Sequence, residues 1–306
     1  MTTVTVIGSI NLDRNIRVVR APQAGETIHT KEIFSAAGGK GANQAVASQR
    51  SGAQTNFIGA IGDDEAGKSM FDLLKREKMN VNGIKIISNQ TTGQAYIIVD
   101  DAGENRIMIH SGANMLFDPD YVQTQASLIE ASDFVIAQFE SPVDSTIKAF
   151  EIARQSGVKT ILNPAPAMEY VPNELLAVTD LIVPNETETE TLTGIKVTDL
   201  DSMQKSAQYF HNLGIKAVII TIGSKGAFYD VDHQGSGIVP AFKVKAVDTT
   251  AAGDTFIGAL CSVLQKDFTN LPDAIKYGNR ASSLTVQRFG AQPAIPFKQE
   301  IIDAEN

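Results

Sequence analysis

The stretch Asp248-Thr-Thr-Ala-Ala-Gly-Asp-Thr-Phe (residues 248–256) says most about the fold of this chain. Gly253 opens a helical pattern, because the apolar residues that follow it recur at helical spacing as far as Leu264. We expect the amides of residues 251–253 to point outward without partners at the start of this helix. Small side chains let a phosphate approach such a backbone, and the helix dipole favours its negative charge. The stretch therefore predicts an anion-binding helix N-terminus.

A carboxylate lies in the same turn of this helix. Asp254 is well placed to take a proton from an attacking alcohol, so it is the candidate catalytic base. The neighbouring backbone of Ala251, Ala252 and Gly253 is the candidate group for holding developing negative charge. The structural alternative is that Asp248 or Asp254 only caps the helix, a role worth ~1 kcal/mol. The Ala-Ala-Gly run meets no packing need at the start of an amphipathic helix and favours the catalytic interpretation.

Short apolar, β-branched runs elsewhere in the chain predict buried strands. They are residues 4–7, 134–137, 160–162, 181–183 and 217–222. Helical patterns separate several of them, for example at residues 145–155 and 205–213. This alternation predicts an α/β fold in which helices cover both faces of a parallel sheet.

Polar or Gly/Pro-rich sequence follows each of these five strands. The five stretches are Gly8-Ser-Ile-Asn-Leu-Asp, Gln138-Phe-Glu-Ser-Pro, Asn163-Pro-Ala-Pro, Pro184-Asn-Glu-Thr-Glu and Gly223-Ser-Lys-Gly. Ligands of open α/β sheets bind at the carboxyl ends of the strands. We therefore expect these five stretches to meet in one site.

Two segments break the α/β alternation. Residues 16–34 and 94–110 alternate like strands, but no crossover helix separates their expected strands. We interpret them as a small antiparallel sheet, made by about residues 14–36 and 93–112, that serves as a lid or a dimer surface. The alternative is an edge extension of the main sheet.

A glycine cluster, Ala37-Gly-Gly-Lys-Gly-Ala-Asn-Gln-Ala, leads into another helix. Its spacing fits neither a Walker A loop nor a dinucleotide fingerprint. The pattern indicates that the backbone here comes close to another group, and that Lys40 and Asn43 can form hydrogen bonds with this group. A tight structural turn would explain the glycines equally well.

Composition excludes several classes of function. The 306 residues are 43% hydrophobic and 20% charged, as is usual for a globular protein with a substantial core. The net charge of −9 disfavours nucleic-acid binding. A single cysteine, Cys261, fits a reducing compartment, and no apolar run approaches the roughly 18 residues that span a membrane. We expect a cytoplasmic protein with no membrane or nucleic-acid partner.

Taken together, these stretches resemble the ribokinase branch of the carbohydrate kinases, which shares its fold with fructokinases and adenosine kinases. Residues 38–45 are similar to the first signature of that family, and residues 248–256 to the second. The stretches that begin at Gly8, Asn163, Pro184, Thr221 and Arg288 fall in the family's order. The resemblance implies one domain over residues 1–306, with a three-layer, parallel-sheet ribokinase-like fold and a small β lid.

The resemblance also implies a role for individual residues. The implied sugar-binding residues are Asn11, Asp13, Gly39, Lys40, Asn43, Glu140 and Asp254, which would act as base on the 5-hydroxyl. The implied nucleotide-binding residues are Asn185, Thr221, Gly223, Lys225, Gly226, Gly253 and, more weakly, Asn279. Asn185 and Glu188 match the motif that organises Mg²⁺ through water, although both are also suited to cap a helix that begins near Glu186. A K⁺ site would take Asp248, Thr250, Thr285, Arg288 and Gly290, although Asp248 is equally able to hydrogen-bond amides in a turn.

The implied activity is transfer of the γ-phosphoryl group of Mg-ATP to the 5-hydroxyl of D-ribose by a K⁺-activated homodimer. The alternatives are a kinase for 2-deoxyribose, fructose or a nucleoside, and a non-catalytic sugar-binding regulator. Two positions depart from the family pattern. Ile257 stands where many relatives have asparagine, and Ala294 replaces a serine near the cation loop, which puts the coordination number of K⁺ in doubt.

Overall fold

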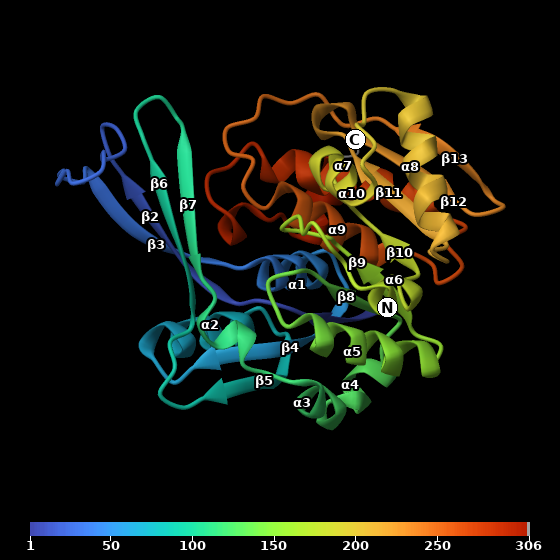
Figure 1. Cartoon of the computed structure of the whole chain (residues 1–306), viewed down its shortest axis with the longest axis horizontal. Coiled ribbons are helices and arrows are strands. Elements are labelled where there is room, and N and C mark those ends of the chain that lie inside the picture. Colours follow the sequence, from blue (N-terminus) through green and yellow to red (C-terminus); the bar gives the residue numbers. More distant parts are fainter. Residues whose placement is uncertain (305–306) are drawn as a thin grey trace.

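The computed structural model describes residues 1–304 and shows a three-layer body from which a smaller sheet projects (Figure 1). The main sheet has nine strands in the order β13-β12-β11-β10-β9-β8-β1-β4-β5. The strands are β1 (Thr3–Ile7), β4 (Gln54–Gly62), β5 (Asn80–Ile87), β8 (Phe134–Ala137), β9 (Lys159–Leu162), β10 (Leu181–Ile182), β11 (Ala217–Thr221), β12 (Ala227–Val231) and β13 (Gly235–Val239). In this spatial order, the seven strands from β11 across to β5 are parallel to their neighbours. Strands β12 and β13 add an antiparallel edge beside β11. The predicted parallel sheet is confirmed.

Helices cover both faces of this sheet and form two separate cores with it. Val4 and Val6 of β1 face the first core, and Ile7 faces the second. The first core is covered by α1 (Lys40–Arg50), α2 (Glu65–Arg76), α9 (Ala252–Val263) and α10 (Leu271–Thr285), with α11 (Lys298–Asp303) packed outside α10. The second is covered by α3 (Pro119–Thr124), α4 (Ala126–Glu130), α5 (Val143–Gln155), α6 (Asn173–Ala177), α7 (Glu186–Thr193) and α8 (Leu200–Asn212). Within residues 1–304, no helix combines the length and apolar character needed to cross a bilayer.

The projecting sheet, which we call the lid, has the strand order β3-β2-β6-β7. Its strands are β2 (Asn11–Arg17), β3 (Glu32–Gly38), β6 (Gly93–Val99) and β7 (Asn105–His110). It is separate from the main sheet, so the edge-extension alternative is wrong. The two outer pairs are antiparallel, whereas the central pair β2–β6 is parallel. The chain runs through β3, α1, β4, α2 and β5 between these central strands, so no hairpin joins them directly or imposes opposite directions on them.

Helices α1 and α9 cross at a glycine, and this crossing brings the two sequence signatures together. A Cβ on Gly258 would lie 2.5 Å from Ala47 Cβ and 2.6 Å from the Gln44 carbonyl oxygen. The close approach needs a residue without a side chain on α9. Asn43 and Gln44 on α1 thereby reach Asp254 on α9.

We expect Gly258→Ala to lower the free energy of unfolding by roughly 1–3 kcal/mol, the usual range for overpacking a tight core contact. Gly253→Ala is the matched control, because a Cβ at Gly253 meets nothing within 4 Å. There the gain in helix propensity predicts no loss of stability. Urea unfolding of both variants measures the difference, and equal stabilities would show that the helices do not depend on Gly258.

Candidate active site

Asp254 lies in the first turn of α9, where the sequence placed it. It is 8% exposed, and the residue before the helix, Ala251, has a left-handed φ of 58°. The Ala252 amide donates to the Thr249 carbonyl at 3.2 Å, so the expectation of three free amides is wrong for Ala252. The turn that leads into the helix uses this donor. Within the described chain, the amides of Ala251 and Gly253 have no hydrogen-bond acceptor and remain available to an anion.

Two amide side chains of α1 hold the Asp254 carboxylate. Asn43 Nδ2 donates to Oδ2 at 3.1 Å, and Gln44 Nε2 donates to Oδ1 at 3.0 Å. Each carboxylate oxygen accepts one of these bonds and keeps capacity for another. The side chain is therefore oriented while it can still accept a proton.

Asp13, on β2 of the lid, is a second buried carboxylate close to Asp254. It is 9% exposed, and its Oδ1 is buried with no hydrogen-bond partner among residues 1–304. Burial, then the negative charges of Glu140 and Asp254, raise the pKa of Asp13 to about 7. A Cβ on Gly38 would lie 2.0 Å from Asp13 Oδ2, so this glycine makes room for the carboxylate. The unpaired oxygen needs a donor such as a sugar hydroxyl.

Glu140 and Lys40 connect this carboxylate group to the start of α1. Glu140 Oε2 accepts the Ser9 hydroxyl at 2.5 Å and the Lys40 amide at 3.0 Å. Burial lowers the pKa of the Lys40 ammonium, but the charges of Asp254, Glu140 and Glu188 outweigh that effect and raise it. Lys40 therefore remains a cation in the middle of the site.

The rest of the glycine cluster packs against the loop after β1. A Cβ on Gly39, whose φ is 89°, would lie 2.8 Å from the Asn11 amide nitrogen. Asn11 is 2% exposed, and its Oδ1 accepts from Asn114 Nδ2 at 2.7 Å. The glycines thus serve a structural turn, and this turn also brings Lys40 and Asn43 to the site. The structural-turn interpretation is confirmed, and the binding role of Lys40 and Asn43 stays a prediction.

A cavity of about 230 Å³ lies beyond Asp254 at the carboxyl ends of the strands. Of the predicted residues, those that line it are Lys40, Asn185, Glu188, Thr221, Ala251, Ala252, Gly253 and Asp254. Gly223 and Lys225 form the 3₁₀ turn η2 (Gly223–Lys225) after β11, followed by Gly226, outside this lining. Asn279, on α10, donates to the carbonyls of Val239 and Pro240 at 3.2 Å, which indicates a structural role for its amide nitrogen.

Asn185 and Glu188 form the capping box of α7. Asn185 Oδ1 accepts the Glu188 amide at 2.8 Å, and Glu188 Oε2 accepts the Asn185 amide at 2.8 Å. The capping alternative is therefore confirmed for both residues. Burial raises the pKa of Glu188 despite its hydrogen bonds and Lys40. Glu188 lines the cavity, and each of its oxygens keeps a lone pair beyond the bond from Asn185, so the pair still fits a hydrated Mg²⁺.

Asp248 forms hydrogen bonds within its own loop and with the loop that contains Gly290, the two loops of the predicted cation site. Its Oδ1 accepts the Thr250 amide at 2.9 Å and the Thr250 hydroxyl at 2.6 Å, and its Oδ2 accepts the Gly290 amide at 2.9 Å. Burial opposes ionisation, but these bonds prevail and lower the pKa of Asp248. The turn interpretation is confirmed, and the ionised carboxylate between two loops also fits a large monovalent cation.

The other predicted cation-site residues have structural partners. Thr285 is fully buried, and its hydroxyl donates to Thr255 Oγ1 at 3.1 Å. The guanidinium of Arg288 pairs with Glu300 at 2.5 Å and reaches the Ala294 carbonyl oxygen at 3.5 Å. Ala294 lies in the 3₁₀ turn η3 (Gln292–Ala294), where it is 1% exposed.

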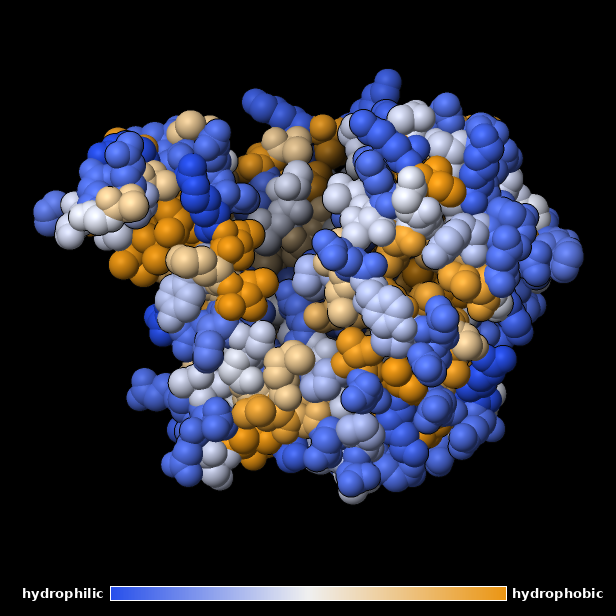
Figure 2. All heavy atoms as spheres, in the orientation of Figure 1, coloured by the Kyte–Doolittle hydropathy of each residue, from blue (hydrophilic) through white to orange (hydrophobic). Residues whose placement is uncertain are grey.

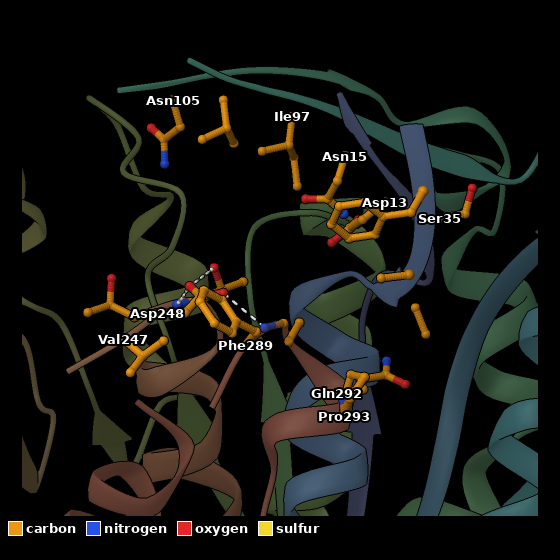
Figure 3. Close-up of a pocket in the computed structure, with 18 of the residues that line it drawn as sticks. Asp13, Asn15, Ser35, Ile97, Asn105, Val247, Asp248, Phe289, Gln292 and Pro293 are labelled. Atoms are coloured by element: carbon orange, nitrogen blue, oxygen red, sulfur yellow. Dashed lines mark hydrogen bonds between the residues drawn. The ribbon is translucent and has the colours of Figure 1, made fainter. Parts of the chain in front are cut away.

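A cavity of about 1180 Å³ separates the lid from the body (Figure 3). Asp13, Asn15 and Ile97 line its lid side, and Asp248 and Phe289 line the body side. Asp13 and the loop that holds Asp248 thus face the same space. Figure 2 shows the hollow and the apolar side chains on the lid beside it.

Comparisons with known proteins agree with this geometry. Residues 1–298 match the pfkB family of carbohydrate kinases. The chain belongs to this family. Its members are phosphotransferases that act on a sugar hydroxyl. The ribokinase of Staphylococcus aureus (strain COL) is 48% identical over 299 residues, which are 97% of this chain and 98% of that protein. The ribokinase of Haemophilus influenzae is 43% identical over 302 residues, 98% of this chain and 97% of that protein.

A solved structure supports the same assignment of the fold. Arabidopsis thaliana ribokinase complexed with ribose and ATP superposes with a TM-score of 0.93 at 30% identity, covering 99% of this chain and 98% of that one. The predicted family, the phosphotransferase class and the ribokinase-like fold with its β lid are confirmed.

Sequence reasoning missed three buried amide side chains of this kinase. Gln44 and Gln138 lie within sequence motifs, but the motifs predict no role for them. Asn114 lies in the 3₁₀ turn η1 (Gly112–Met115), outside every motif. For Gln44 a signal was present, because it is a long polar residue that follows Lys40 and Asn43 in a helix start whose remaining residues are glycine, alanine and valine. For Asn114 only tertiary contact reveals the link to Asn11.

Proposed function

We propose that this protein is an ATP-dependent ribokinase that phosphorylates D-ribose at its 5-hydroxyl, giving ribose 5-phosphate and ADP. The observation that carries the proposal is the position of Asp254, held by Asn43 and Gln44 between the Asp13–Glu140 carboxylates and the cavity at the N-terminus of α9. The relatives named ribokinase support ribose as the sugar. The cytoplasm, where ATP is made and consumed, is the proposed location.

In the proposed mechanism the ribose 5-hydroxyl oxygen attacks the γ-phosphorus of ATP in line with the leaving oxygen of ADP. The new O–P bond forms as the bond to ADP breaks, and the hydroxyl proton moves to Asp254. The amides of Ala251 and Gly253 and the cation of Lys40 stabilise the charge of the transferring group. Mg²⁺, held through water by Asn185 and Glu188, would neutralise phosphate charge. Thr221 and the turn from Gly223 through Lys225 to Gly226 form the proposed nucleotide wall.

Asp13 is the basis for choosing ribose over other sugars. A carboxylate accepts from two vicinal hydroxyls, with Asn11, Gly39 and Asn43 as further proposed contacts, and a substrate that lacks a hydroxyl leaves buried groups unpaired. ADP release measured with ribose, 2-deoxyribose, fructose and adenosine tests the choice. We expect the highest kcat/KM with ribose, and a preference for 2-deoxyribose would refute it. No ADP release with any of the four would instead favour a non-catalytic sugar-binding protein.

We further propose a homodimer that forms through the lid. Register places Ile33 and Met108 on the face away from the cavity, and they are 58% and 56% exposed. The outer strands β3 and β7 also present unpaired edges. Such a small sheet needs cover, and a second lid offers the same apolar face.

Light scattering at micromolar concentration is expected to give the mass of a dimer. Ile33→Glu with Met108→Glu should shift it to the monomer, because two buried carboxylates per subunit oppose association. The matched control is Ile238→Glu on β13, a residue that is 46% exposed and lies on the edge strand of the main sheet, across the molecule from the lid (Figure 1). A monomeric parent protein with full activity would contradict the dimer.

We also propose that K⁺ activates the enzyme from the loops joined by Asp248. Asp248 and Thr250 would supply oxygens, and Thr285, Arg288 and Gly290 would supply backbone carbonyls, a shell that suits a weakly hydrated ion. Turnover with KCl is expected to exceed turnover with NaCl at matched ionic strength, and Asp248→Ala should abolish the difference. Equal rates in both salts would rule out the site.

A further inference from the structure

A buried chain of amide side chains lies behind Asp254. Gln44 Nε2 donates to Asp254 Oδ1 and to Asn163 Oδ1, both at 3.0 Å. Gln138 Nε2, beyond the end of β8, donates to Gln44 Oε1 at 2.6 Å. Asn163, beyond β9, is held in turn by its donation to the Val183 carbonyl at 3.0 Å. The loops after two neighbouring strands are thus connected through α1 to the proposed base.

The charge of Asp254 determines the polarity of this chain. An ionised carboxylate only accepts hydrogen bonds, so Gln44 must present its NH₂ group to Asp254. Both hydrogens of that group are then used, and the Gln44 oxygen points at Gln138. A rotated Gln44 amide would put its oxygen against two other oxygens at 3.0 Å and its NH₂ group against that of Gln138. One orientation of Gln44 is therefore compatible with its surroundings.

This arrangement costs stability, which argues against a purely structural role. Gln44 and Gln138 are 0% and 1% exposed, and Gln138 Oε1 is buried without a partner in the part of the chain that the structure describes. That oxygen lies against Gly8, where a Cβ would come within 2.3 Å of it. An unpaired buried acceptor destabilises the folded state, and apolar side chains would fill the same space without this penalty. The amide side chains are better explained by their effect on the orientation of the Asp254 carboxylate.

We propose that Gln44 is a positioning residue for Asp254 and that Gln138 sets the orientation of the Gln44 amide. The proposal rests on the proposed function, in which Asp254 receives the proton of the sugar hydroxyl. Asn43 on Oδ2 and Gln44 on Oδ1 together fix the plane of the carboxylate. Without Gln44 the carboxylate rotates, and the distance to the hydroxyl proton is no longer controlled.

The first test separates positioning from packing. Gln44→Met keeps length and volume but removes the donor, and we expect kcat to fall by roughly 10²-fold, the scale of a misplaced catalytic group, with KM values for ribose and ATP changed by less than about threefold. Gln138→Met should lower kcat in the same way, by about three- to tenfold, since the donor to Asp254 remains but can rotate. Gln49→Met is the control, because Gln49 lies on the same helix and its Oε1 accepts only the Thr55 amide, at 3.1 Å.

The second test uses the pH dependence of kcat. The charged groups that interact with Asp254 are Lys40 from α1, Asp13 from the lid and Glu188 from α7, with Glu140 beside Asp13. Gln44→Glu adds a carboxylate next to Asp254 Oδ1, so one of the two must hold a proton to a higher pH. We expect the acid limb of the kcat profile to move up by at least about one pH unit. In Gln44→Met that limb should move up by clearly less than in Gln44→Glu, because a neutral hydrogen bond to the carboxylate is lost but no charge is added.

The outcomes distinguish this inference from the proposed function. If folded Asp254→Asn is inactive while Gln44→Met turns over like Gln49→Met, the positioning role is wrong and the base assignment stands. If Asp254→Asn remains active, the assignment of Asp254 as the base fails, and the positioning role of Gln44 fails with it. Should Gln44→Met not fold, Gln138→Met decides, and an unchanged kcat in that variant would overturn the proposal. An unchanged pH profile in Gln44→Glu would also overturn it.

Discussion

Asp254→Asn is expected to lower kcat by roughly 10²–10⁴, the range for loss of a general base, while ATP affinity stays near that of the parent protein. The substitution keeps size and shape but removes the group that takes the hydroxyl proton. Asp254 is the buried carboxylate in the first turn of α9, beside the free amides of Ala251 and Gly253. The measurements are steady-state turnover with ribose and binding of ATP to the same preparation.

Asp267→Asn is the control for this experiment. Asp267 also accepts hydrogen bonds in a turn, from the amide and hydroxyl of Thr269, but it is exposed and lies outside both cavities of the site. Its substitution should leave kcat unchanged. Near-normal turnover in a folded Asp254→Asn protein would show that another group accepts the proton.

The second large effect is expected from Asp13→Ala. Removal of a charged hydrogen-bond acceptor from a closed site should weaken ribose binding by at least ~2 kcal/mol, which raises KM for ribose about 30-fold. The KM for ATP should change little, because Asp13 lies on the lid and ATP is expected beyond Asp254. An unchanged KM for ribose would exclude Asp13 as a sugar ligand.

The raised pKa of Asp13 also predicts a pH dependence. Ribose hydroxyls donate to the ionised carboxylate, so ribose binds best where Asp13 has lost its proton. Since the pKa of Asp13 in the ligand-free protein is about 7, the Kd for ribose should fall by up to about tenfold between pH 6 and pH 8. Calorimetric titration at these two pH values is the measurement. Asp13→Asn should bind weakly and equally at both.

The raised pKa of Asp13 should make the stability of the ligand-free protein fall with rising pH, whereas ribose affinity rises. The folded-state pKa of about 7 lies above the ordinary value of 3.8, so the ligand-free protein loses stability as pH rises through this window. Below about pH 4 the carboxyl is protonated in both folded and unfolded chains, and the penalty is absent. We therefore expect Asp13→Asn to raise Tm at pH 8 and to leave it nearly unchanged at pH 4. Equal effects at both pH values would contradict the burial of an ionised Asp13.

Local sequence was enough to predict the body of this kinase and the position of its candidate base. Each of the five predicted strands of the body is present with both ends within one residue of its expected position, because a short β-branched run bounded by turn residues carries its own signal. Asp254 was identified from a helix start in which small residues precede a carboxylate. The roles of Asn185 and Asp248 were harder to predict, since capping and ion binding use the same residue types.

The sequence by itself thus determined the α/β alternation, the edge of the sheet where the site lies, and the residues that the two signatures contribute. Tertiary structure alone decided the parallel pairing of β2 with β6, the crossing of α1 and α9 at Gly258, and the contacts of Gln44, Gln138 and Asn114. The reason is how far apart in the sequence the interacting residues are. Strand and helix patterns repeat over a few neighbouring residues, whereas Gln44 and Asp254 are 210 positions apart and meet only after the helices have packed.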